Sequence, residues 1–209
     1  SACLSPLKFR PLLRALPWGG RKLGERLGKE LPDAQPYGES WELVDLPEAQ
    51  SRVTGGDFDG VELQELLKTR RQELMGEAEL ADGRFPLLFK FIDAADTLSV
   101  QVHPDEAACA RIGAGARPKT EAWHVLAAEP GAKLYLGLVE GAGPEDLRRA
   151  LAEGTVADLL HAVEVQAGEF TFLPAGMVHA IGAGVLLAEV QQASDTTYRL
   201  FDWNRQGLD

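Results

Sequence analysis

The chain has 209 residues, of which 45% are hydrophobic and 25% are charged, and its formal net charge is −11. A chain of this length can bury one substantial core, and its acidic balance disfavours nucleic acid as a partner because phosphate backbones would be repelled. No apolar run approaches the ~20 residues that span a bilayer, so we expect no membrane association and a cytoplasmic location.

The N-terminal half begins with about forty residues rich in glycine and proline, which predict loops and short strands that wrap a core. Asp59 then predicts a helix N-cap, because Glu62 follows it by three residues and leucines recur at helical spacing through Leu74. Residues 85–103 predict strand structure. Asp105 predicts the cap of a short helix that ends near Arg111.

The C-terminal half alternates helical and strand signals. Residues 141–154 predict a helix with Pro144 near its first position and Gly154 at its end. Residues 155–158 predict the start of another helix, and residues 163–203 predict short strands broken by glycine and proline. We therefore expect a mainly β fold, a barrel core with a few added helices, in one domain over residues 1–209.

Polar side chains recur on one face of several predicted strands. Side chains alternate along a strand, so residues 98–103 place apolar groups on one face and Ser99, Gln101 and His103 on the other. A single polar face of this kind is often solvent-exposed. Two further pairs share a face in the same way, however: residues 119 with 121, and residues 189 with 191. Matched polar faces on several strands favour a polar cavity at the mouth of the barrel.

A set of nitrogen and oxygen donors on these strands has the types that zinc prefers, usually four in number. The set consists of Gln101, His103, Glu121 and His179. His124 lies one residue off the face of Glu121, and His161 lies in a predicted helical stretch, so we expect both to be structural. The sequence thus predicts a metal site built from two histidines, one glutamate and a neighbouring amide.

Several sequence blocks carry a resemblance to a known family. The segment Gly168–His179 has its glycine, proline, glycine and histidine spaced as in the second motif of the cupin β-barrels. Upstream lie Ser99–Asp105 and Lys119–Trp123, and downstream lies Leu187–Arg199. In this order the blocks closely resemble type I mannose-6-phosphate isomerase, the zinc-dependent phosphomannose isomerase family, over nearly the whole chain.

The resemblance implies a cupin-type jelly-roll β-barrel that holds one Zn²⁺ per chain on the four donors above. It also implies a small phosphosugar as substrate, with a pocket formed by four residues of this chain: Ser99, Lys90, Lys119 and Arg199. Cations and a hydroxyl suit a phosphate that carries nearly two negative charges. Asp195 and Arg199 are four residues apart and would share a face if this segment is a strand.

The implied reaction interconverts mannose 6-phosphate and fructose 6-phosphate through a cis-enediolate. Zinc can act as a Lewis acid, and Arg199 and Lys119 can stabilise the developing charge. The shuttling base needs a pKa tuned by burial or neighbours, and three groups qualify: Glu189, Asp195 or a water on the metal.

Two features depart from the family. Many members continue into a further C-terminal barrel domain, whereas this chain ends at Asp209, and Ala183 stands where the short cupin motif ends with asparagine. A non-catalytic, metal-dependent sugar-binding cupin therefore remains an alternative to the isomerase. A second alternative is a cupin oxygenase with iron on a site of two histidines and one carboxylate. No oligomeric state is predicted.

Overall fold

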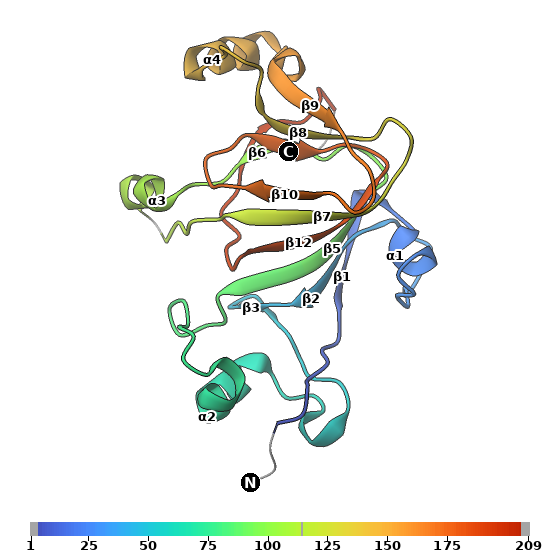
Figure 1. Ribbon diagram of the computed structural model, residues 1–209, viewed down its shortest axis with the longest axis vertical. Coiled ribbons are helices and arrows are strands. Elements are labelled where there is room, and N and C mark those ends of the chain that lie inside the picture. The colour runs from blue at the N-terminus through green and yellow to red at the C-terminus, as the bar shows by residue number, and fades with distance from the viewer. Residues whose placement is uncertain (1–3, 114, 206–209) are drawn as a thin grey trace.

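The computed structural model describes residues 4–113 and 115–205 and contains two antiparallel sheets that face each other (Figure 1). The larger sheet has six strands in the order β1-β2-β5-β12-β7-β10. Its strands are β1 (Leu12–Gly20), β2 (Tyr37–Leu43), β5 (Leu87–Ala94), β12 (Val185–Gln192), β7 (Glu121–Ala128) and β10 (Phe170–Leu173). Neighbouring strands come from distant parts of the chain, so side chains far apart in sequence share one sheet face.

The smaller sheet has five strands in the order β13-β6-β11-β8-β9. They are β13 (Tyr198–Phe201), β6 (Val100–Val102), β11 (His179–Ile181), β8 (Lys133–Leu138) and β9 (Leu160–Glu164). A short hairpin of β3 (Asp45–Leu46) and β4 (Ala49–Gln50) follows β2. Two facing antiparallel sheets confirm the mainly β, jelly-roll arrangement that we expected.

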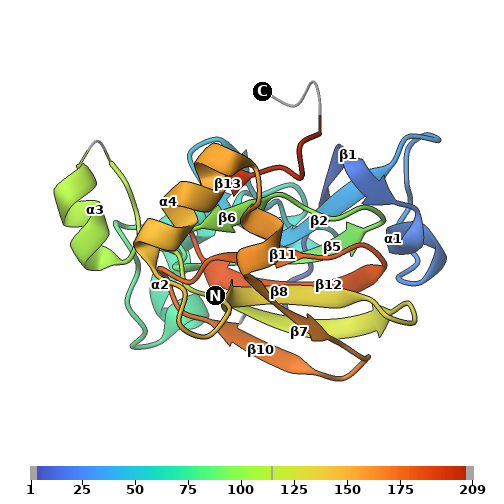
Figure 2. The same cartoon turned by 90° about the horizontal axis from the view of Figure 1, so that it is seen from above.

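Helices lie at the periphery of the sheets. They are α1 (Lys22–Glu25), α2 (Leu63–Met75), α3 (Glu106–Ile112) and α4 (Pro144–Glu153), with 3-10 turns η1 (Gly56–Phe58) and η2 (Val156–Leu159). Figure 2 shows α4 lying over the smaller sheet, where Ala150 packs with Val100 of β6 and Ala180 of β11. No helix among the described residues combines the length and apolar character needed to cross a membrane.

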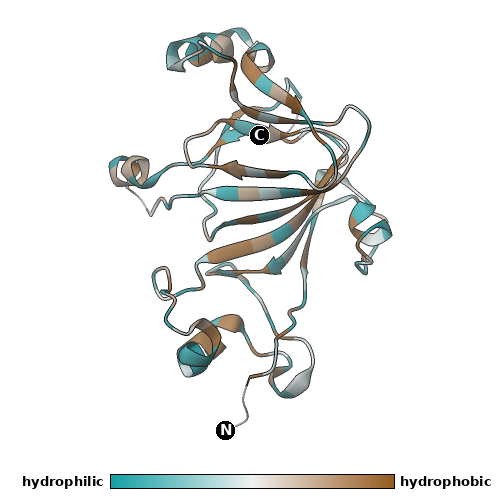
Figure 3. Ribbon diagram, in the orientation of Figure 1, coloured by the Kyte–Doolittle hydropathy of each residue, from teal (hydrophilic) through white to brown (hydrophobic). Residues whose placement is uncertain are grey.

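The inner face of the larger sheet changes from apolar to polar along its strands. Ile92, Leu187 and Val125 are cross-strand neighbours and belong to the main core cluster between the sheets. Two residues away on the same face, Lys90 and Glu189 form the next row. Figure 3 shows hydrophobic and hydrophilic residues mixed along these strands. One end of the barrel is therefore packed with apolar side chains, and the other is lined with polar ones.

Two predicted helices are confirmed, and one begins later than predicted. The α4 helix has Pro144 in its first turn and ends at Gly154 in the left-handed conformation, and the Asp105 carboxylate accepts a hydrogen bond from the Ala108 N–H at 2.6 Å. The predicted cap at Asp59 is wrong. Asp59 instead accepts from the Gly55 N–H at 2.8 Å, which closes the loop before α2 begins at Leu63.

Three further predictions need adjustment. Residues 85–103 form two strands in different sheets, because the chain turns between β5 and β6. The helix expected from residue 155 is only the short turn η2, after which the chain enters β9 directly. His161 therefore lies on a strand, exposed to solvent, and its helical assignment was wrong. In the first forty residues, β1 and β2 are full members of the larger sheet.

A close approach of β1 and β2 shapes the end of the barrel. A Cβ built on Gly19 would lie 2.3 Å from the backbone nitrogen of Gly38, and neither backbone can rotate away. We expect Gly19→Ala to lower the free energy of unfolding by ~2 kcal/mol, the usual scale of overpacking. Urea denaturation of the variant and of the wild type would measure it. An unchanged midpoint would show that the strands separate without cost.

Candidate metal centre and active-site cavity

Three buried side chains converge at the ends of strands from both sheets. His103 follows β6, Glu121 opens β7 and His179 opens β11, and one ligand atom from each lies within 4.8 Å of the others. Two of them lie on the smaller sheet and one on the larger, so folding of the barrel itself assembles the cluster. The structure thus brings together three of the four predicted metal donors.

Both imidazoles are oriented by backbone carbonyls. Nδ1 of His103 lies 3.2 Å from the Thr196 carbonyl, and Nδ1 of His179 lies 2.8 Å from the Met177 carbonyl. A carbonyl can only accept, so each Nδ1 carries the proton and each neutral ring presents the Nε2 lone pair. These Nε2 atoms lie 3.4 and 3.3 Å from the two carboxylate oxygens of Glu121. Anchoring one ring nitrogen on a carbonyl is a usual way of orienting a metal-binding histidine.

Two atoms of the cluster are left without hydrogen-bond donors. Nε2 of His179 and Oε2 of Glu121 are buried and unpartnered, so their 3.3 Å contact is an ion pair only if the imidazole is protonated. Lone pairs facing each other in a buried site call for a cation between them. On the other side of the cluster Lys119 supplies one, because its Nζ lies 2.8 Å from Glu121 Oε1 and 3.3 Å from His103 Nε2. The donor set fits a metal ion.

The electrostatics of the cluster favour ligand protonation states. Burial lowers the pKa of His103, which favours the neutral imidazole. Burial opposes ionisation of Glu121, but its pKa still lies well below the ordinary value, and the Lys119 ammonium at 2.8 Å stabilises the carboxylate whichever nitrogen each imidazole protonates. A neutral imidazole and an ionised carboxylate are the forms that bind metals.

Gln101, the fourth predicted donor, lies beside the cluster. In the strand register it is directly opposite His179 on one side and Arg199 on the other. Directly opposed residues share a sheet face, so all three project toward the same side. Gln101 also lines the cavity that Glu121 lines. Its role as a ligand stays a prediction.

A ladder of charged and aromatic side chains extends from the cluster across the larger sheet. The Lys90 Nζ lies 3.1 Å from Glu189 Oε1 and 3.5 Å from Glu39 Oε1. The other oxygen of each carboxylate accepts an indole N–H at 2.6 Å, from Trp123 for Glu189 and from Trp41 for Glu39. Each charged group is thus held in one orientation by two partners.

The pKa values along this ladder are displaced in ways that its geometry explains. Burial alone would lower the pKa of Lys90, but the carboxylates of Glu189, Glu39 and Glu121 outweigh burial and raise it. Burial raises the pKa of Glu189, and the nearby Glu121 charge adds to the effect. Burial also opposes ionisation of Glu39, yet Lys90 and the Trp41 N–H hold its pKa below the ordinary value. Glu189 is therefore the carboxylate most ready to take up a proton.

Glu121 of the cluster and four residues of the ladder line an inner cavity of about 220 Å³, which adjoins a mouth of about 450 Å³. Glu39, Trp41 and Gln101 line both spaces. Ser99 and Arg199 line the mouth, while Lys90, Lys119, Glu189 and Asp195 line the inner cavity. A polar cavity at the barrel mouth, which the matched polar faces predicted, is thus confirmed.

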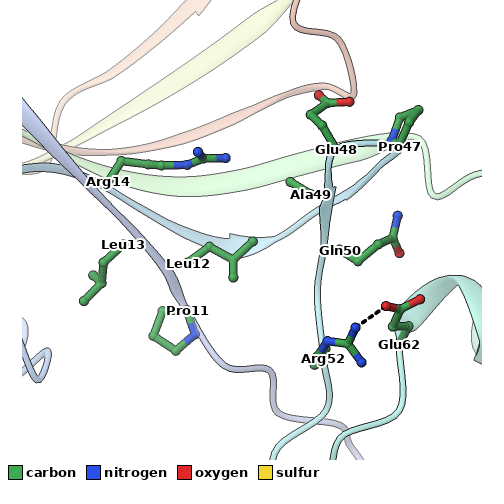
Figure 4. A pocket seen from close by; sticks show the side chains of 10 residues that line it. All are labelled: Pro11, Leu12, Leu13, Arg14, Pro47, Glu48, Ala49, Gln50, Arg52 and Glu62. Carbon is green, nitrogen blue, oxygen red and sulfur yellow. Dashed lines mark hydrogen bonds and ion pairs between the residues drawn. The ribbon is translucent and has the colours of Figure 1, made fainter. Parts of the chain in front are cut away.

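Two expectations about individual residues change. Asp195 precedes β13 and is exposed, so the predicted shared strand face with Arg199 does not exist. His124 is exposed on β7 and lies outside the cluster, as expected. Glu39 and Trp41 were missed, although the alternation from Tyr37 to Trp41 places them on one strand face. A separate hollow of about 580 Å³ between β1 and the β3–β4 hairpin is lined by none of the metal donors (Figure 4).

Comparisons with known proteins agree with this geometry. Two facing antiparallel sheets around a polar cavity define a barrel of the cupin class. The model of the phosphomannose isomerase type I catalytic domain matches residues 7–124. The chain belongs to the type I phosphomannose isomerase family.

Several relatives match along nearly the whole chain. The mannose-6-phosphate isomerase of Streptococcus mutans is 41% identical over 201 residues, and the mannose-6-phosphate isomerase ManA of Bacillus subtilis is 39% identical over 201 residues. Both alignments cover 96% of this chain and 62% of the relative, so the chain spans less than two thirds of their length.

Solved structures share the fold. The crystal structure of the Bacillus subtilis mannose 6-phosphate isomerase superposes with a TM-score of 0.89 at 32% identity, covering 98% of this chain and 64% of that one. A more distant mannose 6-phosphate isomerase, bound with zinc and yttrium, superposes with a TM-score of 0.68 at 22% identity, covering 93% of this chain and 70% of that one. At that identity the likeness concerns the fold alone.

Proposed function

We propose that this chain carries the active site of an aldose–ketose isomerase that interconverts mannose 6-phosphate and fructose 6-phosphate. The observation that carries the proposal is the buried cluster of His103, Glu121 and His179, whose glutamate lines a charged cavity. Relatives that match 96% of the chain are named for this activity. The substrate is then a small phosphosugar.

The cofactor of this proposal is one Zn²⁺ per chain. His103, Glu121 and His179 would hold it, with Gln101 as the fourth donor, a set of nitrogen and oxygen ligands typical of zinc. Zinc is also bound in the more distant structural neighbour. When bound, it supplies Lewis-acid polarisation of substrate oxygens.

Glu189 is the best placed proton carrier. The reaction removes a proton from C2 of the aldose, leaves a cis-enediolate and returns a proton to C1. Glu189 lines the inner cavity, burial raises its pKa, and Trp123 and Lys90 fix its two oxygens. A carboxylate of raised pKa suits a base that must both accept and return a proton. Asp195 lines the same cavity but is exposed, and so it is the weaker choice.

Two cations of the cavity can reach the reacting carbons. Lys119, beside Glu121, stands at the reacting end, where an ammonium can stabilise an enediolate oxygen. Arg199 on β13 borders the mouth but is directly opposite Gln101, so it can reach the same reacting end from the other sheet. Ser99 adds a hydroxyl at the mouth. The sugar would lie with its carbonyl end inward and its phosphate toward the mouth.

A coupled assay with the purified, zinc-loaded protein tests this proposal. We expect turnover of mannose 6-phosphate and at least about 100-fold lower kcat/KM for unphosphorylated mannose, because binding energy from the remote phosphate positions the reacting carbons. Equal efficiency on both sugars would refute a phosphate pocket. Binding of metal and phosphosugar without turnover would indicate the sugar-binding alternative, and oxygen consumption with iron would indicate the oxygenase.

A further inference from the structure

Arg14 of the edge strand β1 stands at the mouth of the cavity, on the wall opposite the smaller sheet. Its guanidinium carbon lies 4.3 Å from the centroid of the Trp41 ring. Arg14 lines the mouth and also the neighbouring groove between β1 and the β3–β4 hairpin, where Figure 4 shows it at the edge of the groove, remote from the Arg52–Glu62 pair. It is the residue that these two spaces share.

Three of the five cations that line the inner cavity and the mouth are paired with carboxylates. Lys90 lies 3.1 Å from Glu189, and Lys119 lies 2.8 Å from Glu121. Arg205 is paired with two acidic side chains, Asp96 and Asp202. Within the described part of the chain, no ion pair is recorded for the two remaining mouth cations, Arg14 and Arg199.

A phosphate with nearly two negative charges needs cations that are not already neutralised. The proposed mechanism places Arg199 beside the reacting carbons, because it is directly opposite Gln101. Arg14 is then the unpaired cation that is available to the phosphate end of the mouth. We infer that Arg14 binds the 6-phosphate and thereby determines the preference for phosphorylated over free sugar. This inference rests on the proposed function.

The contact with Trp41 orients the guanidinium of Arg14 although this side chain is exposed. The indole ring is itself fixed, because its N–H donates to the Glu39 carboxylate at 2.6 Å. A guanidinium that stacks on an aromatic face keeps the N–H donors along its edge free. Those donors can grip two phosphate oxygens as a fork. Glu39 also contacts Lys90, so the phosphate handle is connected through Trp41 to the charged ladder of the inner cavity.

Binding measurements on zinc-loaded protein test the role of Arg14 without relying on turnover. Fructose 6-phosphate is titrated by calorimetry, and fructose is measured by competition against it. We expect Arg14→Gln to weaken fructose 6-phosphate binding about 10- to 100-fold, the scale of a lost charged hydrogen bond, and to change fructose affinity less than about twofold. Arg14→Lys should recover only part of the loss, because ammonium keeps the charge but not the fork.

Arg52→Gln is the matched control. It removes the same charge from the neighbouring groove but not from the mouth, so fructose 6-phosphate affinity should stay unchanged. Undiminished affinity in Arg14→Gln overturns the inference and leaves the proposed function standing. Equal losses for the two sugars also overturn it, since Arg14 would then act only by holding Trp41. A wild-type chain that binds both sugars equally overturns the proposed function and this inference together.

Discussion

Replacing His179 with alanine should remove both zinc and turnover. Its Nε2 faces Glu121 Oε2 at 3.3 Å and has no hydrogen-bond partner, and its Nδ1 is anchored on the Met177 carbonyl. Alanine would leave His103 and Glu121 as an incomplete ligand set on opposite sheets. We expect about one zinc per chain in the wild type, the usual occupancy of such a site, and less than about 0.1 in the variant after reconstitution and dialysis.

His161→Ala is the control for this measurement. His161 is exposed on β9 and is not part of the cluster, so its removal should leave zinc content and turnover unchanged. Comparable zinc loss in the two variants would contradict the assignment of the metal centre. Zinc retained by His179→Ala at wild-type stoichiometry would do so as well, and would move the site away from this cluster.

The sequence could predict the site because strand alternation is a strong local rule. Ser99, Gln101 and His103 were placed on one face by spacing alone, and the structure puts Ser99 and Gln101 at the mouth and His103 in the cluster. The capping signals of Asp105 and Pro144 were equally reliable, because a side chain near a helix start acts within one turn. The sequence is sufficient to predict a strand face or a helix cap, because each is determined within one strand or one helical turn.

Local rules of this kind do not predict interactions that compete with a helix from outside it. The residues around Asp59 match the pattern of a helix cap. The Asp59 carboxylate instead accepts a hydrogen bond from the Gly55 N–H in the loop. The run after Thr155 carries helical spacing, but pairing with β8 draws the chain into β9 after one turn. Helical spacing reveals neither competitor, because one depends on the conformation of the preceding loop and the other on pairing with a separate strand.

The charged ladder shows the same limit within the site. Lys90 and Glu189 were each identified separately, but their pairing follows from β5 and β12 being neighbours, which places the two residues directly opposite each other. Glu39 and Trp41 entered the site only because β2 is next to β5. Strand order decided which of the polar faces would meet, and local patterns do not encode strand order.

Arg199→Ala should reduce turnover by about 100-fold or more, the scale of a lost oxyanion donor, while changing KM much less. Arg199 lies directly opposite Gln101, beside the metal donors, where a protonated fork can meet charge that exists only along the reaction path. Steady-state kinetics on zinc-loaded protein would separate the two parameters.

Arg199→Lys extends the same measurement. It should rescue little, because an ammonium keeps the charge and loses the fixed fork that holds two oxygens. Suppose that Arg199→Ala raises only KM and leaves kcat intact. The arginine would then bind ground state and transition state equally, and its role would be substrate capture. Stabilisation of the enediolate would in that case fall to Lys119 and the metal, and the phosphate would be shared between Arg199 and Arg14 rather than held by Arg14 alone.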